Sequence, residues 1–145
     1  MRKILRALLL PAILLLLLTS CNTETTHFNY TFKGEGDTWS GVYKQEASQK
    51  LITKKDKVTS ESSKQYTFDL KYKGEQSDLG EIKQFKYGYK GTSGGSTRTE
   101  EGPVRWDMLH MGGYGNGAFE YEDSVIKVTV EWDGKSEEFE LKNEK

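Results

Sequence analysis

Residues 125–142 read VIKVTVEWDGKSEEFELK, and this stretch decides the fold. Apolar and polar residues alternate on both sides of Asp133-Gly134, a pattern that is typical of half-buried β-strands. An Asp-Gly pair between two such runs predicts a two-residue hairpin turn. The sequence therefore predicts that the chain ends in a β-hairpin. Its apolar positions are Ile126, Val128, Val130 and Trp132 before the turn, and Phe139 and Leu141 after it.

The same alternation recurs upstream from residue 28, and it is cleanest over residues 66–73. The other segments in which we predict strands are 28–32, 39–44, 51–58, 82–89, 104–108 and 119–121. Segment 51–58 is rich in lysine, which favours an edge strand because lysine discourages edge-to-edge pairing. The polar or glycine-rich stretches predicted as turns and loops are 59–64, 74–80, 91–101 and 112–117.

Short strands at regular spacing, joined by glycine turns, predict an all-β fold. The first expectation is a single antiparallel β-sandwich of about seven to nine strands with immunoglobulin-like architecture. A small β-barrel is the alternative. The Cys-Trp-Cys spacing of true immunoglobulin domains is absent, since Cys21 is the only cysteine. No amphipathic helix is predicted after residue 20.

The first twenty residues differ from the rest of the chain. Residues 1–6 carry three positive charges, and residues 7–18 are apolar apart from Pro11. As a helix, twelve residues cover roughly 18 Å, which is short of a hydrocarbon layer about 30 Å thick. A basic start, a short apolar core and small residues before Cys21 predict a signal-peptide helix over residues 1–20.

Leu18-Thr19-Ser20-Cys21 resembles the lipobox of bacterial lipoproteins. The resemblance implies that Cys21 receives a diacylglyceryl group, that the chain is cut before it, and that the protein is held at the extracytoplasmic face of the cell membrane. Two acyl chains give stable attachment, whereas one holds weakly. Asn22 after the cysteine implies the outer membrane where the source has two membranes. The predicted organisation is a signal peptide (1–20), a lipidated tether (21–26) and one β-domain (27–145).

The net charge of residues 21–145 limits which partners are expected. Removing residues 1–20 leaves 18 basic and 22 acidic residues, a net charge of −4 with neutral histidines. An acidic balance disfavours nucleic acid, whose binders show basic patches. The expected partners are the membrane, through lipid on Cys21, and a protein, a peptide or an envelope glycan.

Two segments of the β-domain carry a further resemblance. Trp39-Ser40-Gly41-Val42-Tyr43 and the stretch from Trp132 to Phe139 are similar to segments of small uncharacterised lipoproteins of spore-forming low-GC bacteria. The resemblance implies a β-sandwich at the cell surface, and it implies no activity.

No constellation of catalytic or metal-binding residues stands out. Zinc sites usually need three or four ligands, and the chain has two histidines, His27 and His110, far apart in sequence. No serine lies in a Gly-x-Ser-x-Gly motif. We therefore predict no catalytic residues, metal or cofactor. The rival hypothesis is a small envelope hydrolase or metal-dependent enzyme that uses His110 with Asp107.

The sequence also indicates a candidate binding surface around the glycine-rich stretch 112–117. Trp106, His110 and Tyr114 are the residues expected to form it, because loops on a rigid β scaffold and exposed aromatic rings favour binding. The alternative is that Trp106 belongs to the core and that the glycines only permit a turn. The sequence thus favours a non-enzymatic binding module, with a structural or immunity-type lipoprotein as a further alternative.

Overall fold

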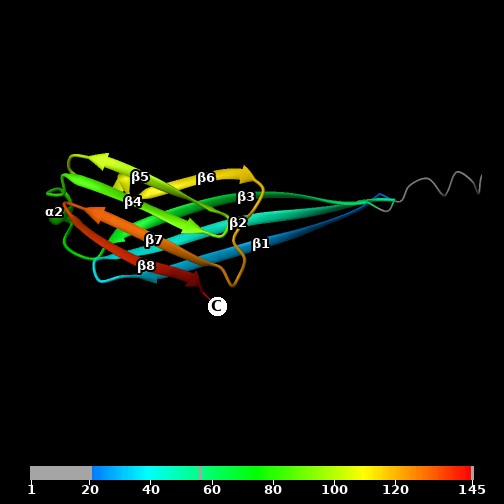
Figure 1. Ribbon diagram of the computed structural model, residues 1–145, viewed down its shortest axis with the longest axis horizontal. Coiled ribbons are helices and arrows are strands. Elements are labelled where there is room, and N and C mark those ends of the chain that lie inside the picture. The colour runs from blue at the N-terminus through cyan, green and yellow to red at the C-terminus, as the bar shows by residue number, and fades with distance from the viewer. Residues whose placement is uncertain (1–20, 56, 145) are drawn as a thin grey trace, which may run out of the picture. The chain divides into compact units, whose positions relative to one another are not determined.

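The computed structural model describes residues 21–55 and 57–144, so the predicted signal-peptide helix lies outside the described residues. Figure 1 shows the order of the elements along the chain. These elements are β1 (Cys21–Glu35), β2 (Trp39–Lys54), β3 (Lys57–Tyr72), α2 (Gln76–Leu79), β4 (Gln84–Gly91), β5 (Gly94–Glu101), the 3₁₀ helix η2 (Trp106–Met108), β6 (His110–Asn116), β7 (Val125–Trp132) and β8 (Lys135–Asn143).

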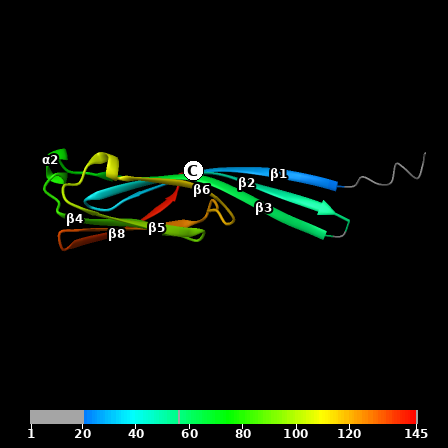
Figure 2. The same ribbon diagram turned by 90° about the horizontal axis from the view of Figure 1, so that it is seen from above.

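The strands form one antiparallel sheet in the order β5-β4-β7-β8-β1-β2-β3-β6. The prediction of an all-β fold is confirmed, and the eight strands described fall within the expected range. The sheet curls into a half-barrel, which corresponds to the barrel-like alternative, and its single continuous order replaces the two sheets of a sandwich. Figure 2 shows β4, β5 and β8 below β6 across the curl.

The C-terminal hairpin forms as predicted. Val128 pairs with Phe139, and Trp132 pairs with Lys135 across the two-residue turn. Asp133 and Gly134 have φ values of 43° and 79°. Positive φ at both central residues is the turn geometry that Asp-Gly favours between twisted strands, so local chemistry and strand pairing agree here.

The core fills the inside of the curled sheet with the residues that the alternation placed inward. Trp39, Phe68 and Leu141 are all completely buried or nearly so, and so are Ile126 and Val128. Aromatic rings dominate: Trp39 lies 5.3 Å from Phe85, and Phe68 lies 5.1 Å from Tyr89, between ring centroids. Such rings bury large areas, and their contacts stabilise the fold beyond area alone.

The two edge strands, β5 and β6, approach each other across the opening of the half-barrel through side chains. Arg98 of β5 donates a hydrogen bond to the carbonyl oxygen of His110 at 3.3 Å. Tyr87 of β4 donates to the carbonyl oxygen of Met108 at 2.6 Å. These contacts hold β6 and the segment before it against the other half of the sheet.

Two glycine-containing stretches predicted as loops are strands. Segment 91–101 contains β5, which pairs with β4 over eight residue pairs, and segment 112–117 falls largely within β6, which pairs with β3 over seven. Glycine is disfavoured in strands because it packs no side chain. In β6 the ring of Tyr66 covers Gly113, where an added Cβ would lie 3.2 Å from that ring. Cross-strand packing therefore overrides the local glycine signal.

Other segments also differ from expectation. Residues 104–108, predicted as a strand, contain η2, and residues 119–121, predicted as a short strand, lie in the connection between β6 and β7. The predicted loop 59–64 belongs to β3, and segment 51–58 spans the end of β2 and the start of β3. The polar residues 59–64 were predicted as a loop because they contain no alternating apolar face.

The chain divides into two compact units, whose described parts are residues 21–26, 49–55 and 57–61, here called the hairpin unit, and residues 27–48 with 62–144, here called the body. Residues 22–26, predicted as a tether, are part of β1. In the hairpin unit, Gln49 donates a side-chain hydrogen bond to Ser60 at 3.3 Å. Within the described residues, no helix has the length and apolar character needed to cross a membrane.

Candidate functional site

The outer face of β3 and β6, within the body, carries two of the three predicted surface residues. In an antiparallel pair, directly opposed residues share one face of the sheet. His110 is opposite Asp69, and Tyr114 is opposite Gln65. All four side chains are exposed. The alternation along β6 turns Met111 inward, where it packs against the core.

A groove of about 650 Å³ lies around Tyr114. Its lining comes from β1, β2, β3 and β6: His27, Asn29, Glu46, Ala47, Ser48, Ser63, Lys64, Gln65, Tyr114, Gly115 and Asn116. A second hollow of about 320 Å³ adjoins it and shares Asn29, Glu46 and Gln65 with it. Together they form one polar trough across the outer face of the sheet, here called the Tyr114 groove.

Tyr114 is 91 % exposed, the most exposed of the large hydrophobic side chains in the described residues. The preceding position on the same face of β6 is Gly112, which has no side chain to support the ring. The ring of Tyr114 contributes little packing to the fold and is available to a ligand.

The polar side chains of the Tyr114 groove are largely uncommitted. Among the residues that the structure describes, no hydrogen bond ties the side chains of Asn29, Gln65 or Asn116 to another residue, while Ser48 and Ser63 bond each other at 2.9 Å. A ligand would therefore find amide donors and acceptors that need no rearrangement.

Another groove, of about 540 Å³, lies beside the β7–β8 turn, and several of its charged side chains are engaged within the fold. The carboxylate of Asp133 accepts hydrogen bonds from the backbone amides of Lys83 and Gln84 at 3.1 and 2.9 Å. Glu131 is paired with Lys86 at 3.3 Å. These side chains serve the fold, which favours the Tyr114 groove as the candidate site.

His110 is hydrogen-bonded to Asp69, with 2.6 Å between Nδ1 and Oδ1, and both side chains are about half exposed. Asp107, the partner that the sequence suggested, instead binds Arg105 at 2.7 Å. Its hydrogen bonds to the Arg105 guanidinium hold the pKa of Asp107 below its usual value. An exposed His-Asp pair on an open sheet face fixes a ring orientation, but general-base catalysis also needs a substrate held within hydrogen-bond reach.

Trp106 lies outside the groove. It is 43 % exposed and begins η2, before β6. His110 and Tyr114, four residues apart in a strand, are already separated by roughly 13 Å at about 3.3 Å per residue. The structure therefore places His110 and Tyr114 on one strand face, but of the three predicted residues only Tyr114 lines the Tyr114 groove.

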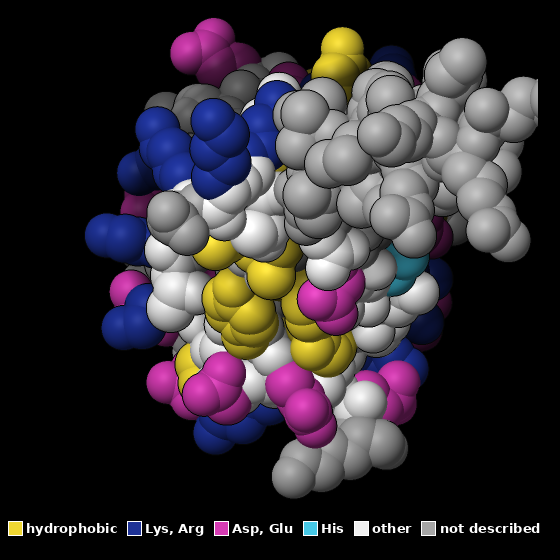
Figure 3. All heavy atoms as spheres, turned by 90° about the vertical axis from the view of Figure 1, so that its right-hand side faces the viewer, with side chains coloured by type: hydrophobic (Ala, Val, Ile, Leu, Met, Phe, Trp, Pro, Cys, Tyr) yellow, Lys and Arg dark blue, Asp and Glu magenta, His cyan; other side chains and the backbone are white. Residues whose placement is uncertain are grey.

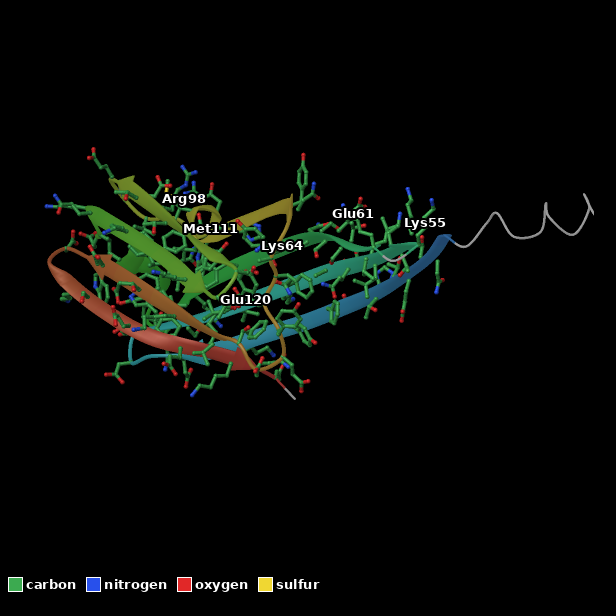
Figure 4. All side chains as sticks on the ribbon, turned by 45° about the vertical axis from the view of Figure 1, so that its right-hand side comes forward. Lys55, Glu61, Lys64, Arg98, Met111 and Glu120 are labelled. Carbon is green, nitrogen blue, oxygen red and sulfur yellow. The ribbon has the colours of Figure 1, made fainter. Side chains whose placement is uncertain are left out.

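A buried carboxylate supports the body at the β4–β5 turn. Glu120 is 2 % exposed and lies in the connection between β6 and β7. It accepts hydrogen bonds from the backbone amides of Thr92 at 3.2 Å and Ser93 at 2.8 Å, and from both hydroxyls. Lys64 donates to the same Ser93 hydroxyl at 3.0 Å. Figure 4 labels Lys64 and Glu120 on this side of the sheet.

Gln45 completes this arrangement from β2. Its amide nitrogen donates to the backbone carbonyl of Glu120, and its amide oxygen accepts from the backbone nitrogen of Glu120, both at 2.9 Å. Burial by itself would raise the pKa of Glu120, but the hydrogen bonds from Ser93 and Thr92 outweigh burial and hold this pKa below its usual value. Glu120 is therefore an ionised side chain that holds the β4–β5 turn through Thr92 and Ser93, an arrangement here called the clamp. Both of its carboxylate oxygens already accept hydrogen bonds.

An aromatic cluster marks another part of the body surface. Phe28 lies 4.9 Å from Phe119, and Phe119 lies 4.8 Å from Tyr121, which is 48 % exposed. Glu122 and Asp123 follow directly in the chain. Figure 3 shows apolar side chains gathered on one face with acidic side chains beside them. Tyr121 is supported by other rings, in contrast to Tyr114.

Sequence reasoning missed most of the groove and the whole of the clamp. Asn29, Glu46 and Gln65 occupy the polar positions of alternating strands, which read as ordinary solvent-facing residues. Only the sheet order brings them beside Tyr114. Glu120 and Gln45 are buried polar residues, and nothing in the local sequence distinguishes them from exposed ones.

Among the described residues, no group of three or more histidine, cysteine, aspartate or glutamate side chains is placed to hold a metal ion. Comparisons with protein-family models, curated proteins and solved structures found no match.

Proposed function

We propose that this chain is a lipoprotein anchored through Cys21 at the extracytoplasmic face of the cell membrane, and that its body is a non-enzymatic module that binds an envelope glycan. The observation that carries the binding role is the 91 % exposed ring of Tyr114 beside a polar groove. The lipobox resemblance at residues 18–21 supports the anchor.

The chemistry of the groove favours a glycan over the other expected ligands. Amides and hydroxyls both donate and accept hydrogen bonds, and the carboxylate of Glu46 accepts them strongly. These groups match the dense hydroxyl groups of a sugar chain. An exposed aromatic ring offers an apolar platform for the face of a sugar ring. Protein interfaces instead concentrate buried aromatic anchors at a dry centre, which this polar trough lacks among its described residues.

The shape of the groove also fits an extended ligand. It crosses four neighbouring strands, β1, β2, β3 and β6, and continues into the adjoining hollow lined by Thr31, Lys44 and Thr67. An open trough without a closed pocket binds along a chain and does not exclude water. This arrangement suits recognition of a polymer and is poorly suited to catalysis, which gains from a water-excluded site.

The test is a binding measurement between the purified lipoprotein and soluble cell-wall glycan fragments. Tyr114→Ala should weaken binding about tenfold, because a stacked aromatic anchor is commonly worth at least 1 kcal/mol. Tyr121→Ala is the matched control, since it removes another exposed tyrosine outside the groove. Equal affinities for the wild type and the Tyr114→Ala variant would overturn the assignment of the groove.

The anchor has its own test. Cells grown with a labelled fatty acid should incorporate the label into the wild-type chain and not into the Cys21→Ala variant. Label that persists on the Cys21→Ala variant would refute lipidation at this position.

A further inference from the structure

The hairpin unit differs in charge from the remainder of the exported chain. Residues 49–61 contain four lysines, Lys50, Lys54, Lys55 and Lys57, against two acids, Asp56 and Glu61, and Glu24 brings the net charge of the whole unit to +1. Since residues 21–145 together carry −4, the rest of that chain carries −5. A positive segment on an acidic protein points to an anionic partner.

Apolar side chains accompany these lysines. Val58 is 63 % exposed and Leu51 is 36 % exposed. The start of β3 is exposed at successive positions from residue 57 to residue 61, so neither face of the strand is covered there. Lysines interspersed with exposed aliphatic residues suit a membrane interface, where the charge meets anionic headgroups and the aliphatic groups enter the acyl boundary.

The backbone at Lys55 supports a role for its charge. Lys55 lies at the turn between β2 and β3 (Figure 4) and has a φ of 53°. This left-handed conformation favours glycine or asparagine and is strained for lysine. Glycine or asparagine would suit this backbone conformation better than lysine, so the geometry of the turn does not account for a lysine at this position.

The proposed anchor belongs to the same unit. Residues 22–26, which follow Cys21, group with residues 49–61 in one compact unit. A lipid on Cys21 would thus hold the lysines close to a bilayer, where each basic residue adds to the attraction by anionic lipids. Two acyl chains and a basic segment together are the kind of paired signal that fixes proteins to membranes.

We propose that the paired ends of β2 and β3, residues 49–55 and 57–61, dock as a hairpin onto the anionic phospholipid surface of the membrane that carries the lipid anchor. This inference rests on the proposed anchoring at Cys21 and adds a second, electrostatic contact to it. The lysines contact phosphate headgroups, and Val58 and Leu51 enter the interface between headgroups and acyl chains. The contact would orient the protein on the bilayer as well as retain it.

The test uses the lipidated protein purified from cells, with Val58→Cys as a labelling site. Because the chain has a single natural cysteine, which the lipid would block, the introduced thiol is the one available to an environment-sensitive fluorophore. The protein is bound to vesicles of phosphatidylcholine alone, or of phosphatidylcholine with phosphatidylglycerol, both containing a headgroup quencher. Quenching reports docking of the hairpin, and co-sedimentation reports the anchor.

The label should be quenched strongly on vesicles that contain phosphatidylglycerol and weakly on vesicles of phosphatidylcholine alone. Added salt should reverse the quenching, because screening limits the attraction between charges to about 10 Å at 0.1 M. Replacing Lys54, Lys55 and Lys57 by uncharged residues (Lys54→Gln, Lys55→Asn, Lys57→Gln) should lower the docked-to-undocked ratio on the order of a hundredfold, at about fivefold per lysine. The matched control removes three exposed lysines of the body (Lys71→Gln, Lys83→Gln, Lys90→Gln) and should leave the ratio unchanged.

The single substitution Lys55→Asn tests whether a loss of docking comes from the lost charge or from altered folding. It should lower docking about fivefold without lowering the melting temperature, since asparagine tolerates the left-handed turn. Quenching that is equal on the two kinds of vesicle, or undiminished by the triple substitution, would overturn the docking. Failure of the anchor looks different, because the protein would then not co-sediment with vesicles of phosphatidylcholine alone, on which the hairpin is expected to dock only weakly.

Discussion

The body and the hairpin unit share the strands β1, β2 and β3 but use them differently. In the body, residues of β3 alternate between buried aromatic positions, such as Phe68, and exposed polar ones. In the hairpin unit, the same strand is exposed at successive positions, including the 63 % exposed Val58. Alternation of buried and exposed residues therefore marks the part of a strand that packs on the core. Where this alternation is lost, both faces of the strand are available to contact a partner.

The largest expected difference comes from one substitution made in both regions. Val128→Ala removes two methyl groups from a fully buried position of β7, and it should lower the free energy of unfolding by about 2 to 3 kcal/mol through lost burial and the cavity left behind. Val58→Ala should change this free energy by less than about 0.5 kcal/mol. Urea denaturation measures both values, and similar losses would contradict the division between the two regions.

Glu120→Gln tests the clamp that supports the body. It replaces an ionised acceptor of several hydrogen bonds with an amide that faces donors, so it should lower the free energy of unfolding by about 2 kcal/mol at neutral pH. The exposed Glu122→Gln is the matched control and should have almost no effect.

The effect of Glu120 should also depend on pH. Because the pKa of Glu120 is lowered in the folded protein, its stabilising contribution is present above the unfolded value of about 4.3 and is lost as pH falls through the lower folded pKa. The difference in unfolding free energy between wild type and Glu120→Gln should therefore shrink in acid. A difference that grows as pH falls would contradict an ionised clamp.

Two glycines of β6 refine the comparison within the body. Gly113→Ala places a Cβ 3.2 Å from the ring of Tyr66 and should destabilise by about 1 kcal/mol, since that ring packs against the core. Gly115→Ala meets open space and should be neutral or stabilising by up to about 0.5 kcal/mol through reduced freedom of the unfolded chain. Thermal unfolding monitored by circular dichroism compares them, and equal effects would refute the packing of Tyr66 over Gly113.

The smallest expected effect lies in the hairpin unit. Lys55→Asn relieves a strained turn and should raise the free energy of unfolding by about 0.5 kcal/mol or leave it unchanged. The same urea experiment measures it. A clear loss of stability would mean that Lys55 serves the fold, contrary to the role in membrane contact.

The sequence predicts the elements whose local chemistry agrees with their packing. The hairpin around Asp133-Gly134 forms as expected, because the turn residues and the alternating apolar positions require the same register. β5 was missed because its glycines and polar residues lack an apolar alternation and were predicted as a loop, while the turn at Thr92-Ser93 is held by Glu120, which is distant in sequence. β6 was missed because its glycines indicate a loop, whereas in the structure the ring of Tyr66 from β3 covers Gly113.

The candidate site was also only partly predictable from the sequence. Tyr114 and His110 were predicted from residue type, and the structure places both on the outer face of β6. The pairing of His110 with Asp69, and not with Asp107, follows from strand register, which a single sequence does not specify without knowledge of the partner strand. The polar lining from β1 and β2 depends on sheet order and was not predictable from the local sequence for the same reason.

The central claim is that the body binds a glycan while the hairpin unit contacts the membrane, and amide hydrogen exchange of the lipidated protein on anionic vesicles tests it most directly. Vesicles should slow exchange in residues 49–61 and leave β6 unchanged, whereas glycan fragments should slow exchange around Tyr114 in β6 and the facing part of β3 without affecting residues 49–61. Protection of β6 by vesicles, or of residues 49–61 by glycan, would contradict the division of roles.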